Sequence, residues 1–199
     1  MLTAIAVNIG QFFIDFTIKY KVPLLFYLGI ILLIYLIRKK LEWAAPLIGL
    51  YKTKVGINSM KYWSEKQGPF VRWLGLLGIG VGFTGMIFIV FTLLIGLFQI
   101  FDMEAAPTIS PVIPGFAIPG LGMTIPLVAG WLALFVVIVV HEFSHGVVSK
   151  AHGIPIKSSG LMFFGPLLAA FVEPDEKKLQ EAPDYVQYSM YAAGPFSNV

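Results

Sequence analysis

Three long apolar runs constrain this chain more than any other feature of its sequence. They lie at about residues 23–37, 73–101 and 125–148, and the first two contain no charged residue. A helix of about 20 such residues crosses the hydrocarbon core of a bilayer. Only 13% of the residues are charged, against about 25% in soluble domains. We therefore predict an all-α polytopic membrane protein, with about three full transmembrane helices and the start of a fourth.

The apolar runs divide the chain into six expected segments. Residues 1–21 form an amphipathic N-terminal segment, which either edges the first transmembrane helix or lies in the membrane interface. The next four segments are a first transmembrane helix, a basic cytoplasmic loop, a second transmembrane helix and a Pro/Gly-rich outer loop, at residues 22–40, 41–72, 73–101 and 102–124. Residues 125–199 form the core, which holds a third helix, a strand-like segment and a fourth helix beginning near Tyr188.

Lysine and arginine are distributed unevenly between the loops. Residues 38–72 hold eight of them and residues 150–187 hold four, whereas residues 102–124 hold none. Because basic loops stay on the cytoplasmic side, the N-terminus is expected outside and the two basic segments inside. The formal charge of +3 is too small and too dispersed to indicate a nucleic-acid partner.

The second run carries Gly75, Gly78, Gly82 and Gly85 at spacings of three and four residues. These glycines share one face of a helix, and such faces let a neighbouring helix approach closely. We therefore expect another helix to pack along this face.

The third run contains an HExxH motif at residues 141–145. Histidines four residues apart project from one face of a helix, so His141 and His145 can bind one zinc ion. Glu142 can reach a metal-bound water as general base and then protonate the leaving amine. The chain has no cysteine, so a thiolate metal site is excluded. The motif predicts metal-assisted hydrolysis, with Glu142 as the catalytic residue.

The depth of the motif in the membrane adds to this prediction. His141 lies about 16 residues into the third run, which is about 24 Å along a helix. Ionisable side chains in the inner part of a bilayer are costly and usually functional. The competing interpretation is a helix end at the cytoplasmic interface, where polar residues need no special reason.

His152 is a candidate third ligand seven residues after His145. On a continuous helix it lies about 10 Å further along the axis, too far for one zinc ion. Gly153 and Pro155 end the helix, so a fold-back is conceivable. A solvated histidine at a helix C-terminus is the favoured interpretation.

The sequence HEFSHG, followed about fifty residues later by Ala193-Gly194-Pro195-Phe196-Ser197-Asn198, resembles the site-2 protease family of intramembrane zinc metalloproteases, of peptidase M50 type. The resemblance covers roughly residues 120–199 and, more loosely, residues 50–56. It implies zinc ligation by His141 and His145, with Glu142 as catalytic acid and base. It also implies that Gly194, Pro195 and Asn198 open a helix beside the active site, where we expect them to contact substrate.

The family's third ligand is an aspartate in a later transmembrane helix, in a Leu-Asp-Gly or similar context. Asp175 and Asp184 lie in hydrophilic sequence and do not match that pattern. The third zinc ligand is therefore expected outside this chain, which would be an N-terminal catalytic fragment.

Residues 156–172 are rich in Phe, Leu and Gly, and we expect one or two short strands, a cytoplasmic-side hairpin, broken at Gly160 and at Gly165-Pro166. A helical transmembrane substrate must unwind before it is cut, and a strand edge near the zinc could hold it by strand addition. A re-entrant or surface hairpin with no substrate role is an equal alternative.

The sequence thus predicts a zinc metalloprotease that hydrolyses peptide bonds of transmembrane proteins within the membrane, as in regulated intramembrane proteolysis. The lipid bilayer and a transmembrane protein substrate are its expected partners. One alternative is a membrane zincin that cuts at the cytoplasmic membrane surface. A less favoured one is a metal transporter or binding protein, because the first two spanning runs offer only Thr84, Thr92 and Gln99 as polar residues.

Overall fold

The computed structural model describes residues 2–99, 110, 112–119 and 121–199. The N-terminal half contains helices α1 and α2, a short 3-10 turn, strands β1 and β2, and helices α3 and α4, at Leu2–Lys19, Lys21–Ile37, Arg38–Lys40, Glu42–Ala45, Ile48–Thr53, Ile57–Lys66 and Gly68–Gln99. The C-terminal half contains α5, β3, β4, α6 and α7, at Leu127–Ala151, Ile156–Phe164, Leu167–Pro174, Glu176–Gln180 and Asp184–Ser197.

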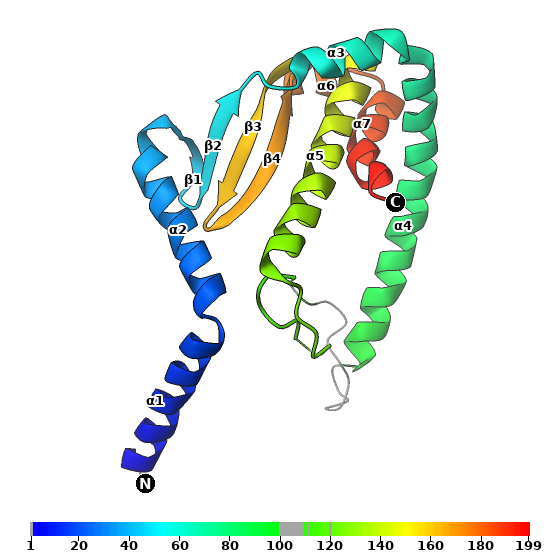
Figure 1. Cartoon of the computed structure of the whole chain (residues 1–199). Helices are drawn as coiled ribbons and strands as arrows, with labels where there is room; N and C mark the ends of the chain where they lie inside the picture. The colour runs from blue at the N-terminus through cyan, green and yellow to red at the C-terminus, as the bar shows by residue number, and fades with distance from the viewer. Residues whose placement is uncertain (1, 100–109, 111, 120) are drawn as a thin grey trace.

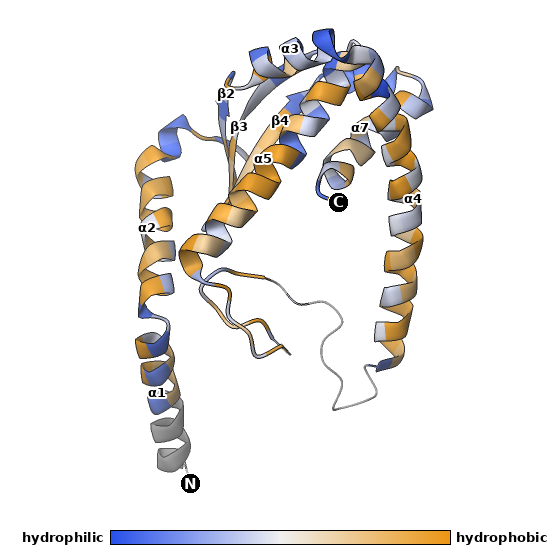
Figure 2. Ribbon diagram, turned by 45° about the vertical axis from the view of Figure 1, so that its right-hand side comes forward, coloured by the Kyte–Doolittle hydropathy of each residue, from blue (hydrophilic) through white to orange (hydrophobic). Residues whose placement is uncertain are grey.

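Three of the described helical segments are long and apolar enough to cross a membrane: Lys21–Lys40, Gly68–Gln99 and Leu127–Ala151. They correspond to the three predicted spans, although α4 begins five residues before Trp73. Hydrophobic residues dominate α2, α4 and α5, while hydrophilic residues gather at the end of the molecule that holds α3 (Figure 2). This pattern fits an integral membrane protein whose α3 end lies at a membrane surface.

The sheet is larger than the predicted hairpin. Its four antiparallel strands follow the order β1-β2-β3-β4, so β3 pairs with β2 on one side and β4 on the other. The first two strands arise from the segment expected to be a basic loop. Sequence analysis missed them because pairing of β2 with β3 joins residues about a hundred positions apart, as in Thr53 with Ser159.

The expected break at Gly160 is wrong, since β3 runs through it from Ile156 to Phe164. A Cβ at Gly160 would overlap the Tyr51 carbonyl on β2. Glycine at this position therefore allows β2 and β3 to approach closely, and it does not interrupt the strand. The second expected break is confirmed, because Gly165 and Pro166 form the turn between β3 and β4, with Gly165 at a φ of +54°.

Charged side chains join three strands of the sheet. Lys52 on β2 lies 3.1 Å from carboxylate oxygens of both Glu42 on β1 and Glu173 on β4. The Ser158 hydroxyl donates to Glu173. This hydrogen bond and the nearby Lys52 ammonium hold the pKa of Glu173 below its usual value. The polar group thus ties β4, which borders the site described below, to β1 and β2.

The glycine face of α4 packs against α7, as the spacing predicts. A Cβ on Gly75 would lie 3.0 Å from Ser189 Cβ, and one on Gly78 would lie 3.3 Å from Phe196 Cβ. Gly82 faces Ala192 at 3.7 Å, whereas nothing lies within 4 Å of Gly85. The first three glycines therefore set the distance between α4 and α7.

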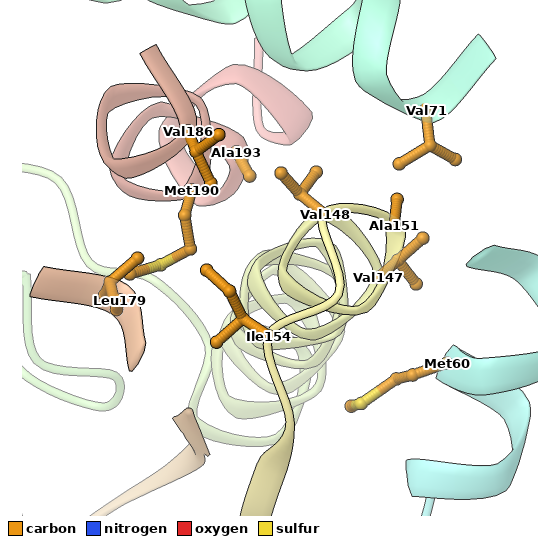
Figure 3. Close-up of a cluster of buried hydrophobic side chains, with 10 residues drawn as sticks. All are labelled: Met60, Val71, Val147, Val148, Ala151, Ile154, Leu179, Val186, Met190 and Ala193. Atoms are coloured by element: carbon orange, nitrogen blue, oxygen red, sulfur yellow. The ribbon is translucent and has the colours of Figure 1, made fainter. Parts of the chain in front are cut away.

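A buried hydrophobic cluster joins the helices at the α3 end of the molecule (Figure 3). Its side chains come from α3, α4, α5, α6, α7 and the turn after α5, and are Met60, Val71, Val147, Val148, Ala151, Ile154, Leu179, Val186, Met190 and Ala193. Met60 of α3 lies against Gly146, where a Cβ would overlap the methionine sulfur. On α5 the cluster begins two residues after the HExxH motif, so it holds α7 against the part of α5 that adjoins the motif.

Aromatic residues organise the opposite end. Tyr27 of α2 donates to the Pro114 carbonyl over 2.9 Å, and Trp131 of α5 donates to the Tyr27 hydroxyl over 3.2 Å. Ala117 and Thr124 form an isolated antiparallel bridge. The described part of the outer loop is therefore an ordered segment that connects α2 to α5. Residues 100–109, 111 and 120, which belong to the predicted second helix and outer loop, lie outside the described residues.

Candidate metal centre

The two motif histidines lie side by side on the face of α5 that packs against α7. Their ring centroids are 4.8 Å apart with an interplanar angle of 74°. Both side chains are partly buried. The helical spacing thus places the two imidazoles together, as the sequence predicts.

The His145 ring is oriented by the backbone of α7. Its Nδ1 lies 2.6 Å from the carbonyl oxygen of Met190. Because a carbonyl oxygen can only accept a hydrogen bond, Nδ1 carries the proton and donates it. The lone pair of this neutral imidazole is then on Nε2, the atom available to a metal.

The His141 ring is oriented by a side chain from the C-terminal end of α7. The Asn198 amide faces it, with Nδ2 3.0 Å from Nδ1 of the imidazole. Asn198 follows Ser197 as the C-cap residue of α7. Both histidines therefore contact α7 through Nδ1, and neither Nδ1 is free for a metal.

The Nε2 atoms of both histidines face Gly194 on α7. A Cβ built on Gly194 would overlap Nε2 of His141 and Nε2 of His145. Both nitrogens therefore lie directly against the backbone of Gly194, with no room for a side chain between them. Neutral imidazole nitrogens are common ligands of zinc and of other transition metals. The donor set, two Nε2 atoms turned toward the same residue, fits a metal ion held by His141 and His145.

Glu142 points to the other side of α5, toward the sheet. Its Oε2 accepts a hydrogen bond of 2.9 Å from the backbone N–H of Val172 on β4. A cavity of about 460 Å³ lies between α5 and the strands, lined by Glu142 together with residues of β2, β3, β4 and α3. The carboxylate is thus next to His141 along the helix but directed into the space that borders the β4 edge.

The other acidic and histidine candidates lie away from this site. His152 is the C-cap residue of α5 with its ring 6.1 Å from that of Tyr185. The predicted position at a helix C-terminus is confirmed, but the Nε2 atom of this partly buried side chain is not solvated; burial lowers the pKa of His152. Asp175 accepts from Lys178 N–H at the start of α6, and Asp184 begins α7. Within the described ranges, no three His, Cys, Asp or Glu side chains converge on one point.

The structure changes the expected arrangement of the Gly-Pro segment. Gly194, Pro195 and Asn198 lie at the end of α7, whereas the helix opens at Asp184. Gly194 and Asn198 face the histidines, but Pro195 lines a cavity on the side of α4. The helix does pack beside the site, as expected. The difference arises because Asp184 and the residues after it are already helical in a sequence too polar to resemble a transmembrane span.

Part of this region is similar to a known protein family. Residues 129–199 match the model of peptidase family M50. The match contains α5 from residue 129 on, the β3–β4 hairpin and α7, and so includes His141, Glu142, His145 and Asn198.

Nearly the whole chain also has a relative. It is 31% identical over 188 residues to an uncharacterized protein of Methanocaldococcus jannaschii, and the aligned region covers 90% of the chain and 48% of that protein. The chain thus spans about half the length of the curated relative it matches. No solved structure matches the chain significantly.

Two backbone groups of this site could not be predicted from the sequence. The Met190 carbonyl orients His145, and the Val172 N–H binds Glu142. Backbone groups leave no mark on residue type, so sequence could reveal them only through the positions of α7 and β4. The side chains of His141, Glu142 and His145 were identifiable because their spacing within one helix is itself the signal.

Proposed function

We propose that the protein is a zinc metalloprotease that hydrolyses peptide bonds of transmembrane substrates within the membrane. The observation that carries this proposal is the pair of Nε2 atoms of His141 and His145, which converge on Gly194, on a helix long enough to span a bilayer. Glu142 adjoins the pair. The M50 match supports the chemistry. Family resemblance supplies the third ligand, an aspartate beyond the residues described above.

When bound, zinc would polarise the scissile carbonyl and make a water molecule more acidic. His141 and His145 would hold the ion through Nε2. Glu142 would take the proton from the attacking water and return it to the leaving amine. To do so, its carboxylate must leave the Val172 N–H, to which it is bound in this structure.

The edge of β4 is the candidate substrate-binding element. β4 pairs only with β3 in the described sheet, and its Val172 N–H points away from β3 toward α5. Ala170, Phe171 and Val172 of β4 line the cavity between α5 and the sheet. An extended substrate segment would add to this edge, take the Val172 donor and thereby release the carboxylate of Glu142. Substrate binding and release of the base would then be one event.

The decisive experiment is Glu142→Gln in the purified protein, assayed in lipid vesicles with a transmembrane substrate. Gln keeps the shape of the side chain and leaves both histidines intact, so zinc content should stay unchanged. Cleavage should fall at least about 100-fold, the lower end of what a general base contributes. The matched control is Ser144→Ala, because the Ser144 hydroxyl bonds only its own helix, at the Val140 carbonyl. Retained cleavage in Glu142→Gln would overturn the proposed role.

Mapping the cleaved bond separates this function from its nearest alternative. Cleavage inside the substrate's apolar span supports the proposal, whereas cleavage only in its flanking cytoplasmic residues indicates a zincin that works at the membrane surface. A metal transporter is disfavoured because the hydroxyls of Thr84 and Thr92 bond carbonyls of their own helix, at Gly80 and Phe88. Metal uptake into vesicles without proteolysis would restore that alternative.

A further inference from the structure

The face of α7 that meets the histidines repeats every four residues. Met190 contacts His145, Gly194 faces both rings, and Asn198 contacts His141. Residues four apart lie on the same side of a helix, so these three residues, each about one turn from the next, all face the histidines. The two histidines differ in one respect: a backbone carbonyl orients His145, but a side chain orients His141.

The side-chain contact matters because the two ends of an Asn amide differ: the NH2 group donates hydrogen bonds and the oxygen accepts them. The N and O atoms of an Asn amide are assigned from the hydrogen-bond network, and a half-turn about its last side-chain bond exchanges them. If the amide NH2 donates to Nδ1 of His141, the imidazole proton sits on Nε2, which then cannot bind a metal. If the amide oxygen accepts from Nδ1–H, the Nε2 lone pair faces Gly194 beside that of His145.

We propose that Asn198 is a positioning residue of the metal centre: its amide oxygen accepts from Nδ1–H of His141 and selects the tautomer whose Nε2 binds the ion. This inference rests on the proposed function, since it concerns the same metal. It replaces the substrate contact expected for Asn198 from the sequence. Outer-shell acceptors of this kind orient a ligating histidine and raise its basicity, and their loss costs about 10–100-fold in metal affinity.

The test compares zinc affinities by competition with a chromophoric chelator. Asn198→Leu removes the acceptor at similar size and should weaken zinc binding about 10–100-fold. Asn198→Asp keeps an acceptor that cannot donate, and it should bind zinc at least as tightly as wild type. Ser197→Ala is the matched control, because the Ser197 hydroxyl bonds the Gly194 carbonyl of its own helix and should leave affinity unchanged.

A second measurement does not depend on the variants' stability. The chain has three histidines, so the 15N resonances of the wild-type imidazoles are readily assigned and report which nitrogen carries the proton. Zinc-free His141 should show Nδ1 protonated. Protonation at Nε2, or Asn198→Leu binding zinc as tightly as wild type, would overturn the role of Asn198 alone. A wild-type protein that takes up no zinc would overturn the proposed function as well.

Discussion

At the scale of single residues, the sequence predicted the features of the site that depend on neighbouring residues of one helix. It did not predict those that depend on contacts between distant segments. His141, Glu142 and His145 followed from their spacing, because a helix turns residues four apart to the same side. The direction of Glu142 did not follow, since it depends on where β4 ends up. The burial of His152 Nε2 was missed for the same reason, because Tyr185 reaches it from α7.

Gly194 gives the sharpest residue-scale prediction. Gly194→Ala should lower zinc affinity at least about tenfold, the lower end of what a disturbed ligand orientation costs, because its methyl would overlap both Nε2 atoms and push the two rings aside. Helix stability should not suffer, since Ala is the better helix former by about 0.5–1 kcal/mol. Chelator competition measures the affinity, and circular dichroism checks the fold.

The matched control for Gly194→Ala is Gly85→Ala on α4. Nothing lies within 4 Å of a Cβ at Gly85, and the residue is likewise inside a helix. This variant should bind zinc as wild type does. Equal zinc affinities for all three proteins would mean that the metal does not lie beside Gly194.

At the scale of elements, helices were predictable and the sheet was not. Each long helix corresponds to one contiguous apolar run in the sequence, so the positions of α2, α4 and α5 were predicted to within a few residues. Strands β1 and β2 lie in a stretch whose basic residues suggested a loop, and their partner β3 is distant in sequence. α7 was expected as the start of a transmembrane helix, but it begins earlier, at Asp184, beside polar residues.

The β4 edge carries the element-scale prediction. Val172→Pro removes the N–H that binds Glu142, and the β3–β4 ladder should survive because that N–H points away from β3. A substrate strand added to β4 would then bury one carbonyl without a donor, at a cost of about 1–3 kcal/mol. KM for a transmembrane substrate should therefore rise at least about fivefold in a vesicle assay.

Val172→Leu is the control for this change, because it alters the side chain and keeps the backbone donor. Its KM should stay close to that of wild type. If Val172→Pro and Val172→Leu have the same KM, substrate does not use this edge of the sheet, even if proteolysis itself is confirmed.

At the scale of the whole molecule, α5 separates two working surfaces. One face of its motif meets α7 and carries the imidazoles of His141 and His145, and the adjacent face meets the sheet and carries Glu142; α5 lies between α7 and the sheet (Figure 1). The hydrophobic cluster and the glycine face of α4 hold α7 in place on one side. The charged group around Lys52 ties the strands together on the other. These contacts have a structural role, and they hold in place α7 and β4, the two elements that contact the site.

The whole molecule also has a predicted orientation, which cysteine labelling tests cleanly because the chain contains no cysteine. Met123 is exposed in the outer loop, whereas Glu65 and Lys177 are exposed at the α3 end. The lysines and arginines at that end should keep it in the cytoplasm. An impermeant maleimide should therefore label Met123→Cys in intact cells, but Glu65→Cys and Lys177→Cys only after the membrane is opened. The reverse pattern would place the end of α5 that carries His141 and His145 at the outer leaflet, so that cleavage would release its products outside the cell.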